Sequence, residues 1–443
     1  MSDTPLSAAL GFARMLAAGG LRLDPVESAP SIEDLRALAR KRLPTMAFDI
    51  IDGASNHEVT LEANTRDLRE VTFRPRWLTD ISTVDMSTTV DGMALDRPYV
   101  MGPLGLQRMI GGEGELGAVR AAGAANMPFT ISTASNWTME ELAEQATGPL
   151  WFQLYMYGSE QIVTNLIDRA KGIGAEAMAV TVDAPLISKR YRDHRNGMSI
   201  PPKVTPRNAV EAVRHLNWTR AIMRPPVIGF RNIQDLVQGD DAVSHQEFVA
   251  QHLANLTLSW DDIASVRRRW DGPLYLKGIL TPEDAQRARA TGADGIYVSN
   301  HGGRQLDSSP STISALPRIV DAVGEHMSVI FDGGVRTGDD IAKALAVGAD
   351  LVSIGRAWGY GNAAAGEKGV ARVLEILDGE LELAMGQLGA TSVAALDRGF
   401  VDYPEAWHGH GRHREPEGAP AGPAQADGTA APQNVVNRPA GRR

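Results

Sequence analysis

Short apolar runs recur along this chain, and each is followed by a segment whose apolar positions have helical spacing. The runs are nearly continuous in Val, Ile, Leu, Met and Ala, which indicates strands buried on both faces, as in a parallel sheet. Eight such units predict an α/β fold of the TIM (β/α)8 barrel type rather than an open doubly wound sheet. The predicted strands cover 98–102, 128–132, 150–154, 177–182, 273–277, 295–299, 328–332 and 351–355, and the predicted helices cover 113–125, 139–146, 161–171, 282–291, 311–323 and 338–347.

Two segments fall outside this alternation. Residues 188–258 form a long insertion between the fourth and fifth strands, which predicts a lid at the strand-exit face or an interaction loop. Residues 409–443 are rich in Gly, Pro, Ala, Gln and Arg, which predicts a disordered tail. We therefore expect an N-terminal extension over 1–30, one barrel domain over 31–408 and the tail.

Charge and composition narrow the classes of partner. The formal net charge of −10 and the lack of a long basic run before the tail leave no footprint for nucleic acid. The chain contains no cysteine, which excludes disulfides, thiolate metal sites and a cysteine nucleophile. His408, His410 and His413 have metal-like spacing, but they stand at the predicted tail, so we expect solvated histidines and no metal site.

The apolar segments give no sign of a membrane anchor. Arg14 interrupts the apolar stretch 6–21, which makes it a poor signal peptide, and no run approaches the ~18 apolar residues of a spanning helix. We expect a soluble, cytoplasmic protein. Peripheral membrane contact through the insertion stays open but is not favoured, because the insertion lacks a sustained apolar face.

The turn after the sixth strand, Ser299-Asn-His-Gly-Gly-Arg-Gln-Leu-Asp307, carries the most chemistry. His301 can take up a proton near neutral pH, and Arg304 can clamp a carboxylate. This pair indicates a site that binds an acid and removes hydrogen next to the carboxylate.

Other strands end in polar residues that the barrel would bring to the same mouth. Gln153 and Tyr155 share one face of the third strand, and Thr181 and Asp183 share one face of the fourth. The fifth strand ends at Lys277, which needs a facing anion; it could form a Schiff base or stabilise negative charge on a reduced cofactor ring.

A phosphate site is expected after the seventh and eighth strands, where barrel enzymes commonly hold one. The seventh strand ends in Asp332-Gly333-Gly334-Val335-Arg336 and the eighth in Gly355-Arg356. The glycines expose backbone N–H groups and the arginines supply positive charge, so these turns predict a ligand with a terminal phosphate.

These motifs resemble those of the FMN-dependent 2-hydroxy acid oxidases and dehydrogenases, the family of glycolate oxidase, L-lactate dehydrogenase and (S)-mandelate dehydrogenase. The resemblance covers roughly residues 31–400 and includes 151–155, 181–183, 276–278, 299–307 and 332–336. Segments 131–136 and 192–198 are most similar to the lactate and mandelate dehydrogenase branches.

The resemblance implies a role for each matching residue. His301 would be the active-site base, paired with Asp183, while Arg190 and Arg304 would hold the substrate carboxylate and Tyr155 would lie near the substrate hydroxyl. Lys277 would stand at the pyrimidine edge of FMN and favour its anionic reduced form. Further FMN contacts would come from Ser132, Gln153, Thr181 and Ser299 to the ring or ribityl chain, from the backbone of Pro103, Leu104 and Gly105 to the flavin face, and from Asp332, Gly333, Gly334, Val335, Arg336, Gly355 and Arg356 around the phosphate.

Departures from the family pattern bear on the substrate. Ile50 replaces a tyrosine expected at the substrate carboxylate, and the loss of one hydrogen bond to a charged group costs about 1.5–3 kcal/mol of binding. Ala134 stands where glycolate oxidase carries a tryptophan, and Gly105 stands where oxidases often have alanine. Both small residues favour a bulky, even aryl, 2-hydroxy acid.

The sequence therefore predicts oxidation of a bulky (S)-2-hydroxy acid to the 2-oxo acid, with reoxidation of FMN by oxygen, a quinone or another acceptor. The resemblance also implies a homo-oligomer, often a tetramer. Two alternatives stay open. Ile50 and the altered segment 54–57 suggest a pathway enzyme that acts on a modified peptide or carrier-bound acid, and a flavin-binding interaction module without turnover is the third hypothesis.

Overall fold

A computed structural model describes residues 24–157, 159–186, 188–198, 205–226, 228–236 and 255–408. The predicted tail 409–443, with His410 and His413, lies outside the described residues, as do residues 1–23 and parts of the insertion. The predicted boundaries of the extension, the barrel domain and the tail stay predictions.

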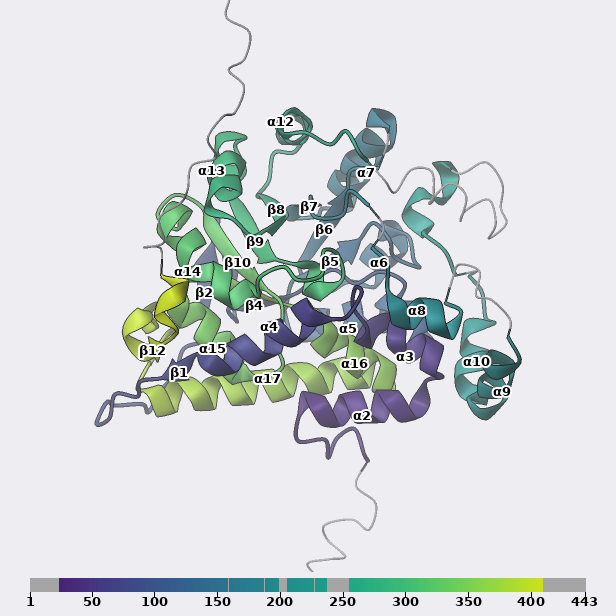
Figure 1. Ribbon diagram of the computed structural model, residues 1–443, viewed down its shortest axis with the longest axis horizontal. Coiled ribbons are helices and arrows are strands. Elements are labelled where there is room, and N and C mark those ends of the chain that lie inside the picture. Colours follow the sequence, from purple (N-terminus) through teal and green to yellow (C-terminus); the bar gives the residue numbers. More distant parts are fainter. Residues whose placement is uncertain are drawn as a thin grey trace, which may run out of the picture. The chain divides into compact units, whose positions relative to one another are not determined.

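The predicted (β/α)8 barrel is confirmed. Eight parallel strands, β4 to β11, form a closed barrel (Figure 1). Each strand pairs with the next one in the chain, and β11 pairs with β4 to close the barrel. All eight predicted strands are present, with ends shifted by at most a few residues. They are β4 (Tyr99–Met101), β5 (Phe129–Ser132), β6 (Leu150–Tyr155), β7 (Ala177–Thr181), β8 (Leu274–Ile279), β9 (Gly295–Ser299), β10 (Ser328–Asp332) and β11 (Leu351–Ile354).

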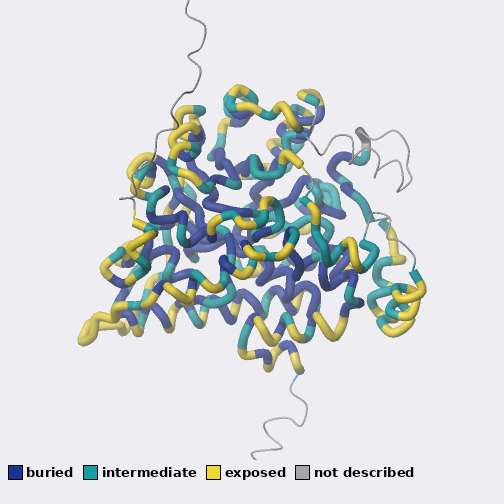
Figure 2. Tube along the Cα trace, viewed as in Figure 1, coloured by how far each residue is buried: buried dark blue, intermediate teal, exposed yellow. Residues whose placement is uncertain are grey.

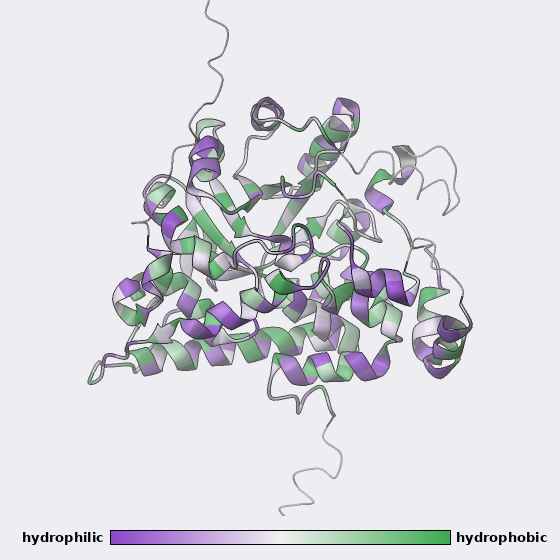
Figure 3. Cartoon of the chain, viewed as in Figure 1, coloured by the Kyte–Doolittle hydropathy of each residue, from purple (hydrophilic) through white to green (hydrophobic). Residues whose placement is uncertain are grey.

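Burial explains why the strands read as continuous apolar runs. Helices cover the outer face of the barrel and side chains fill its interior, so both faces of each strand are buried, and the strands form the dark centre of Figure 2. The surrounding helices are α5 (Glu115–Ala124), α6 (Met139–Gln145), α7 (Glu160–Gly172), α12 (Trp260–Arg269), α13 (Pro282–Ala290), α14 (Thr312–Val323), α15 (Gly338–Val347), α16 (Arg356–Ala365) and α17 (Glu367–Leu388). Most of the surrounding helices are amphipathic and show both green and purple residues in Figure 3, whereas α16 is buried almost throughout.

Within the described residues, three helices precede the barrel: α2 (Ile32–Arg42), α3 (Thr45–Asp52) and α4 (Val59–Glu70). Helix α2 packs against α16, and the segment before it is part of the core, because Val26 and Ala29 are buried and Lys368 forms salt bridges with Asp24 and Glu27. The packed body therefore begins within the stretch that the sequence assigned to an extension. A small sheet joins β1 (Thr72–Phe73) to β12 (Val401–Asp402).

A hairpin that the sequence analysis missed closes the N-terminal end of the barrel. Strands β2 (Thr88–Val90) and β3 (Met93–Leu95) pack Val90 and Leu95 against inward-facing side chains of the barrel. At the turn, Asp91 accepts hydrogen bonds from the Tyr275 hydroxyl (2.6 Å) and the Ser328 hydroxyl (2.9 Å). The signal was present as Asp91-Gly92 between two short apolar runs, which favours a two-residue hairpin.

The described part of the insertion is largely helical and is hydrogen-bonded to the rest of the protein at several points. It contains α8 (Tyr191–Asn196), α9 (Pro206–Arg214) and α10 (Leu216–Ile222). At its start, the Asn56 N–H donates to the Lys189 carbonyl (2.9 Å). After α10, the buried Arg108 guanidinium donates to the carbonyls of Arg224 and Pro226. No helix in the described ranges is both long and apolar enough to span a bilayer.

Replacing each of two buried tyrosines on neighbouring strands by phenylalanine should affect the free energy of unfolding differently. Tyr275→Phe should lower the free energy of unfolding by about 1 kcal/mol, because the Asp91 hydrogen bond is lost. Tyr297→Phe should leave it unchanged or raise it, because the buried Tyr297 hydroxyl has no hydrogen-bond partner among the described residues. Urea unfolding of the two variants measures both effects, and equal losses would contradict the expectation.

Candidate active site

The predicted site residues come together at the C-terminal end of the barrel. Strand register sets their order around the mouth, because Ser132 pairs with Gln153, Tyr155 with Thr181, and Thr181 with Lys277. Neighbouring strands thus present polar side chains at similar heights inside the barrel.

His301 and Asp183 form a hydrogen-bonded pair. The His301 Nδ1 atom lies 3.0 Å from Asp183 Oδ1, and burial lowers the pKa of His301 while Asp183 acts in the opposite direction. His301 has a φ of 58°, in the left-handed region that a histidine adopts at a cost. Gly278 has φ 114°, and a Cβ there would lie 2.5 Å from the Asp183 Cβ, so glycine at this position lets the carboxylate approach the barrel wall.

Tyr155 faces the other nitrogen of the same ring. Its hydroxyl lies 3.5 Å from His301 Nε2, at the outer limit of a hydrogen bond, and burial raises the pKa of Tyr155 to about 12. The phenol is therefore protonated at neutral pH and can donate to a ligand oxygen placed between the two side chains.

Lys277 has the anionic partner that its burial requires. Its Nζ donates to Asp332 Oδ2 and to the Ser299 hydroxyl, each at 2.8 Å, and the Ser299 hydroxyl donates to the same carboxylate at 2.6 Å. Burial alone would lower the pKa of Lys277, but the Asp332 and Asp183 carboxylates together with Tyr155 outweigh burial and raise it. The side chain is thus a charged ammonium, which disfavours the Schiff-base alternative because a nucleophilic lysine must be neutral.

A chain of neutral hydrogen bonds crosses the next three strands. The Ser132 hydroxyl donates to Gln153 Oε1 (3.0 Å), and Gln153 Nε2 donates to the Thr181 hydroxyl (2.9 Å). All three side chains are buried. Together with Lys277 they give a row of donors and acceptors of the kind that the edge of a flavin ring requires.

The two expected substrate arginines lie near one another at the mouth. Burial lowers the pKa of Arg190, and burial together with Arg190 and Arg356 lowers the pKa of Arg304 further. Arg304 Nη1 donates to the Gly53 carbonyl (2.9 Å), whereas Arg190 Nε has no hydrogen-bond partner among the described residues. Two partly buried guanidinium groups with spare donors suit a carboxylate ligand. Asp193 lies 3.7 Å from Arg190 Nη1, and the sequence analysis did not identify it.

Arg356 has a different place from the one expected for its side chain. Its guanidinium donates to three carbonyls, those of Ile51, Gly302 and Gly53, each at 2.8 Å, and burial lowers its pKa to about 10. The side chain therefore joins α3 to the His301 turn instead of facing a phosphate. Sequence alone could not show this, because the acceptors come from two segments far from Arg356 in the chain, 51–53 and Gly302.

The remaining phosphate residues fit an anion. Gly355 precedes α16 without a side-chain cap, so the first N–H groups of the helix are available to an anion. A Cβ on Gly355 would meet only Leu104 Cδ2, at 3.8 Å, which shows open space above this turn. Arg336 lies beside the same helix, with its guanidinium 5.5 Å from the Tyr360 ring centroid. Gly333, Gly334 and Val335 link Asp332 to Arg336 in the turn after β10.

The expected flavin-face loop follows β4. Pro103, Leu104 and Gly105 are partly exposed, and the loop contacts the turn after β5 through the Leu106 N–H and the Ala134 carbonyl (3.1 Å). A Cβ on Gly105 would lie 2.8 Å from both the Cβ and the carbonyl oxygen of Ala134. Glycine here therefore serves the close approach of these two loops, and the space that it leaves is directed toward Ala134.

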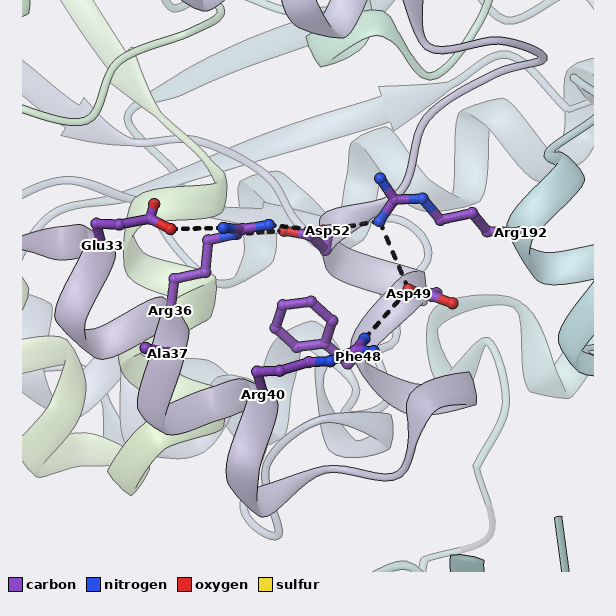
Figure 4. A pocket seen from close by; sticks show the side chains of 8 residues that line it. All are labelled: Glu33, Arg36, Ala37, Arg40, Phe48, Asp49, Asp52 and Arg192. Carbon is purple, nitrogen blue, oxygen red and sulfur yellow. Dashed lines mark hydrogen bonds and ion pairs between the residues drawn. The ribbon is translucent and has the colours of Figure 1, made fainter. Parts of the chain in front are cut away.

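An ion-pair network fixes α8, the helix that carries Asp193, to the N-terminal helices (Figure 4). Arg192 pairs with Asp52 (2.8 Å) and Glu58 (2.5 Å), and Arg36 pairs with Asp52 from α2 (2.6 Å). Arg36, Asp52 and Arg192 line a cavity of about 520 Å³. Because every charge in the cavity has an opposite partner, we interpret it as an anchor for the insertion.

Comparisons with known proteins agree with this geometry. The family described as FMN-dependent dehydrogenase matches residues 39–403. L-lactate dehydrogenase of Caulobacter vibrioides (strain NA1000 / CB15N) is 41% identical over 372 residues, covering 83% of this chain and 96% of that protein. L-lactate dehydrogenase of Acinetobacter baumannii (strain AYE) is 40% identical over 369 residues, covering 82% and 95%.

Solved structures are similar as well. The monotopic membrane protein (S)-mandelate dehydrogenase superposes with a TM-score of 0.80 at 33% identity, covering 85% of this chain and 100% of that one. Mandelate oxidase superposes with a TM-score of 0.72 at 37% identity, covering 85% and 98%.

The fold and the site therefore define an FMN-dependent enzyme built on a (β/α)8 barrel. The chain belongs to the family of FMN-dependent 2-hydroxy acid dehydrogenases and oxidases, as its motifs predict. FMN is the cofactor of the family, and the row from Ser132 to Lys277 and the cationic turn at Arg336 fit its ring and its phosphate. The described residues contain no group of three or more acidic or histidine side chains that could hold a metal ion.

The two phosphate-side arginines predict separable effects. Arg336→Ala should raise the Kd for FMN about ten- to a hundredfold, because one charge-assisted hydrogen bond is lost, with little change in apoprotein stability. Arg356→Ala should lower the free energy of apoprotein unfolding by about 3 kcal/mol or more, because three carbonyls lose a buried donor. FMN fluorescence titration and urea unfolding, with exposed Arg289→Ala as control, distinguish the two; identical behaviour would refute the assignment.

Proposed function

We propose that this enzyme oxidises a bulky (S)-2-hydroxy acid to the 2-oxo acid, with His301 as the base. The arrangement of His301 carries the proposal: Nδ1 is held by Asp183 at 3.0 Å, and Nε2 points toward Tyr155 beside two buried arginines. A 2-hydroxy acid has the matching groups, a carboxylate for the arginines and an adjacent carbon and hydroxyl for the base.

Binding precedes proton transfer. Arg190 and Arg304 take the substrate carboxylate, which also relieves their mutual repulsion. The Tyr155 hydroxyl, protonated with a pKa of about 12, donates to the oxygen on C2. These contacts orient the C2–H bond toward the flavin side of the mouth.

His301 then accepts the proton of the hydroxyl or of C2 on Nε2. The Asp183 carboxylate holds the ring and stabilises the imidazolium that forms. When bound, FMN supplies the acceptor for the two electrons. Lys277, kept cationic by Asp332, would stabilise negative charge at the nearby edge of the ring.

Two observations bear on the size of the substrate. Two mandelate-converting proteins have similar structures, which supports an aryl acid; Gly105 itself adds no room, because Ala134 fills the space beside it. The L-lactate dehydrogenases have higher identity, which makes L-lactate the second candidate. The modified-peptide alternative remains a hypothesis that rests on Ile50. The module without turnover is not favoured, because the family is enzymatic and the His301–Asp183 pair is assembled.

One sequence-based argument about membranes needs correction. Helices α9 and α10 expose large apolar side chains, among them Val213 (69% exposed) and Met223 (79%) just after α10, so this part of the insertion does present an apolar surface (Figure 2). A similar structure is a monotopic membrane protein. This surface is our candidate for contact with a membrane that holds a quinone acceptor, whereas cytoplasmic location and a tetramer stay predictions.

Anaerobic flavin bleaching tests the proposed function. We expect (S)-mandelate to reduce the bound flavin faster than L-lactate or glycolate, and His301→Ala to slow reduction by about 10²-fold or more. Reoxidation by air, by a soluble dye and by a quinone in vesicles identifies the acceptor. An unchanged rate in His301→Ala rejects the base assignment, and bleaching by lactate alone selects the second candidate.

The pH dependence of flavin reduction follows from the environment of His301. Because burial lowers the His301 pKa, the neutral base persists below the ordinary range, and reduction should lose speed only as pH falls through that lowered value. Asp183 raises this pKa, so Asp183→Asn should move the acidic limb to lower pH and weaken the base, slowing reduction about 10²- to 10⁴-fold. A stopped-flow pH profile with exposed Asp271→Asn as control measures this; a limb shifted to higher pH would contradict it.

A further inference from the structure

Carboxylates of the described residues neutralise the two substrate arginines only in part. Arg190 and Arg304 carry two positive charges at the mouth, and Asp193 is the one carboxylate within salt-bridge distance of Arg190 among the described residues, at 3.7 Å. Arg304 forms no salt bridge within that same part of the chain, and its printed partner is the neutral Gly53 carbonyl. Arg190, Arg304 and Asp193 taken together carry one net positive charge, which matches a ligand with one carboxylate.

Asp193 forms no hydrogen bond that would orient the Arg190 side chain. Its Oδ2 lies beyond hydrogen-bond distance, and both Asp193 Oδ1 and Arg190 Nε are buried without a partner among the described residues. The side chains are only 17% and 26% exposed, so solvent screens their interaction weakly. The effect of Asp193 on the mouth is therefore electrostatic rather than positional.

The anchored helix keeps Asp193 from turning away. Asp193 stands on α8, whose Arg192 is bound to Asp52 and Glu58 and whose Asn196 donates to Asp49 (Figure 4). The fixed backbone holds a negative charge close to the place where the substrate carboxylate binds.

We propose that Asp193 determines specificity as a fixed counter-charge: it weakens anion binding at the arginine pair in proportion to ligand charge and so selects 2-hydroxy monoacids over 2-hydroxy diacids. This inference rests on the proposed function, since it concerns the same carboxylate site. Glu58, the other carboxylate near α8, is neutralised directly by Arg192 (2.5 Å).

A ladder of nearly isosteric ligands tests the proposal. Oxamide is neutral, oxamate carries one negative charge and oxalate carries two, and each is read in the FMN-loaded enzyme by the shift of the flavin absorption. In Asp193→Asn, we expect the Kd to fall about threefold to tenfold for oxamate and about tenfold to a hundredfold for oxalate, with oxamide unchanged, because Coulomb energy scales with ligand charge. A role in folding or shape would not produce this grading.

Control variants complete the design. Asp193→Glu retains the charge and should keep the wild-type ladder, Asp271→Asn removes a remote exposed charge and should also keep it, and Asp193→Ser is a second neutral variant in case the first does not fold. No change in Asp193→Asn, weaker binding of oxamate and oxalate, an equal change for all three ligands, or a Glu variant that behaves like Asn would each overturn the proposal. If no 2-hydroxy acid bleaches the wild-type flavin, the proposed function fails, and the ladder still reports on Asp193.

Discussion

The burial of positive charge at the barrel mouth is the constraint on which the site depends. A lysine and three arginines stand where water is largely excluded, and each requires an anion or a set of carbonyls. Lys277 has Asp332, and Arg356 has three backbone carbonyls. Arg190 and Arg304 are the incompletely satisfied members, and this local deficit is what makes the mouth a receptor for a carboxylate.

Much of this architecture is readable from sequence, because parallel strands buried on both faces must be apolar and must end where the chain turns to the mouth. All eight strands could be placed in this way, and with them His301, Asp183 and Lys277. The interaction partners of the buried cations could not be predicted from the sequence. That Asp332 faces Lys277 and that Arg356 turns toward Gly53 follow from how strands and helices pack, not from local pattern.

The insertion is a second case in which the sequence predicts the position of a segment but not its contacts. Its position after the fourth strand predicts that it lies near the site. The contacts of Arg108 and of Arg192 that hold it in place could not be recognised from composition. Both arginines act on backbone or side chains far away in the chain. The segment predicted to be a lid or an interaction loop therefore begins with a helix, α8, that ion pairs join to the N-terminal helices and that carries Asp193 beside Arg190.

The pairing of distant strands has a consequence for biosynthesis. Barrel closure joins β4 to β11, and the small sheet joins β1 to β12, so early and late segments of the chain complete one another. Long-range parallel pairing forms slowly and leaves unpaired strand edges exposed in the meantime. Until β11 has been synthesised, the edge of β4 that pairs with it stays unpaired. Assistance by chaperones would matter most in that interval.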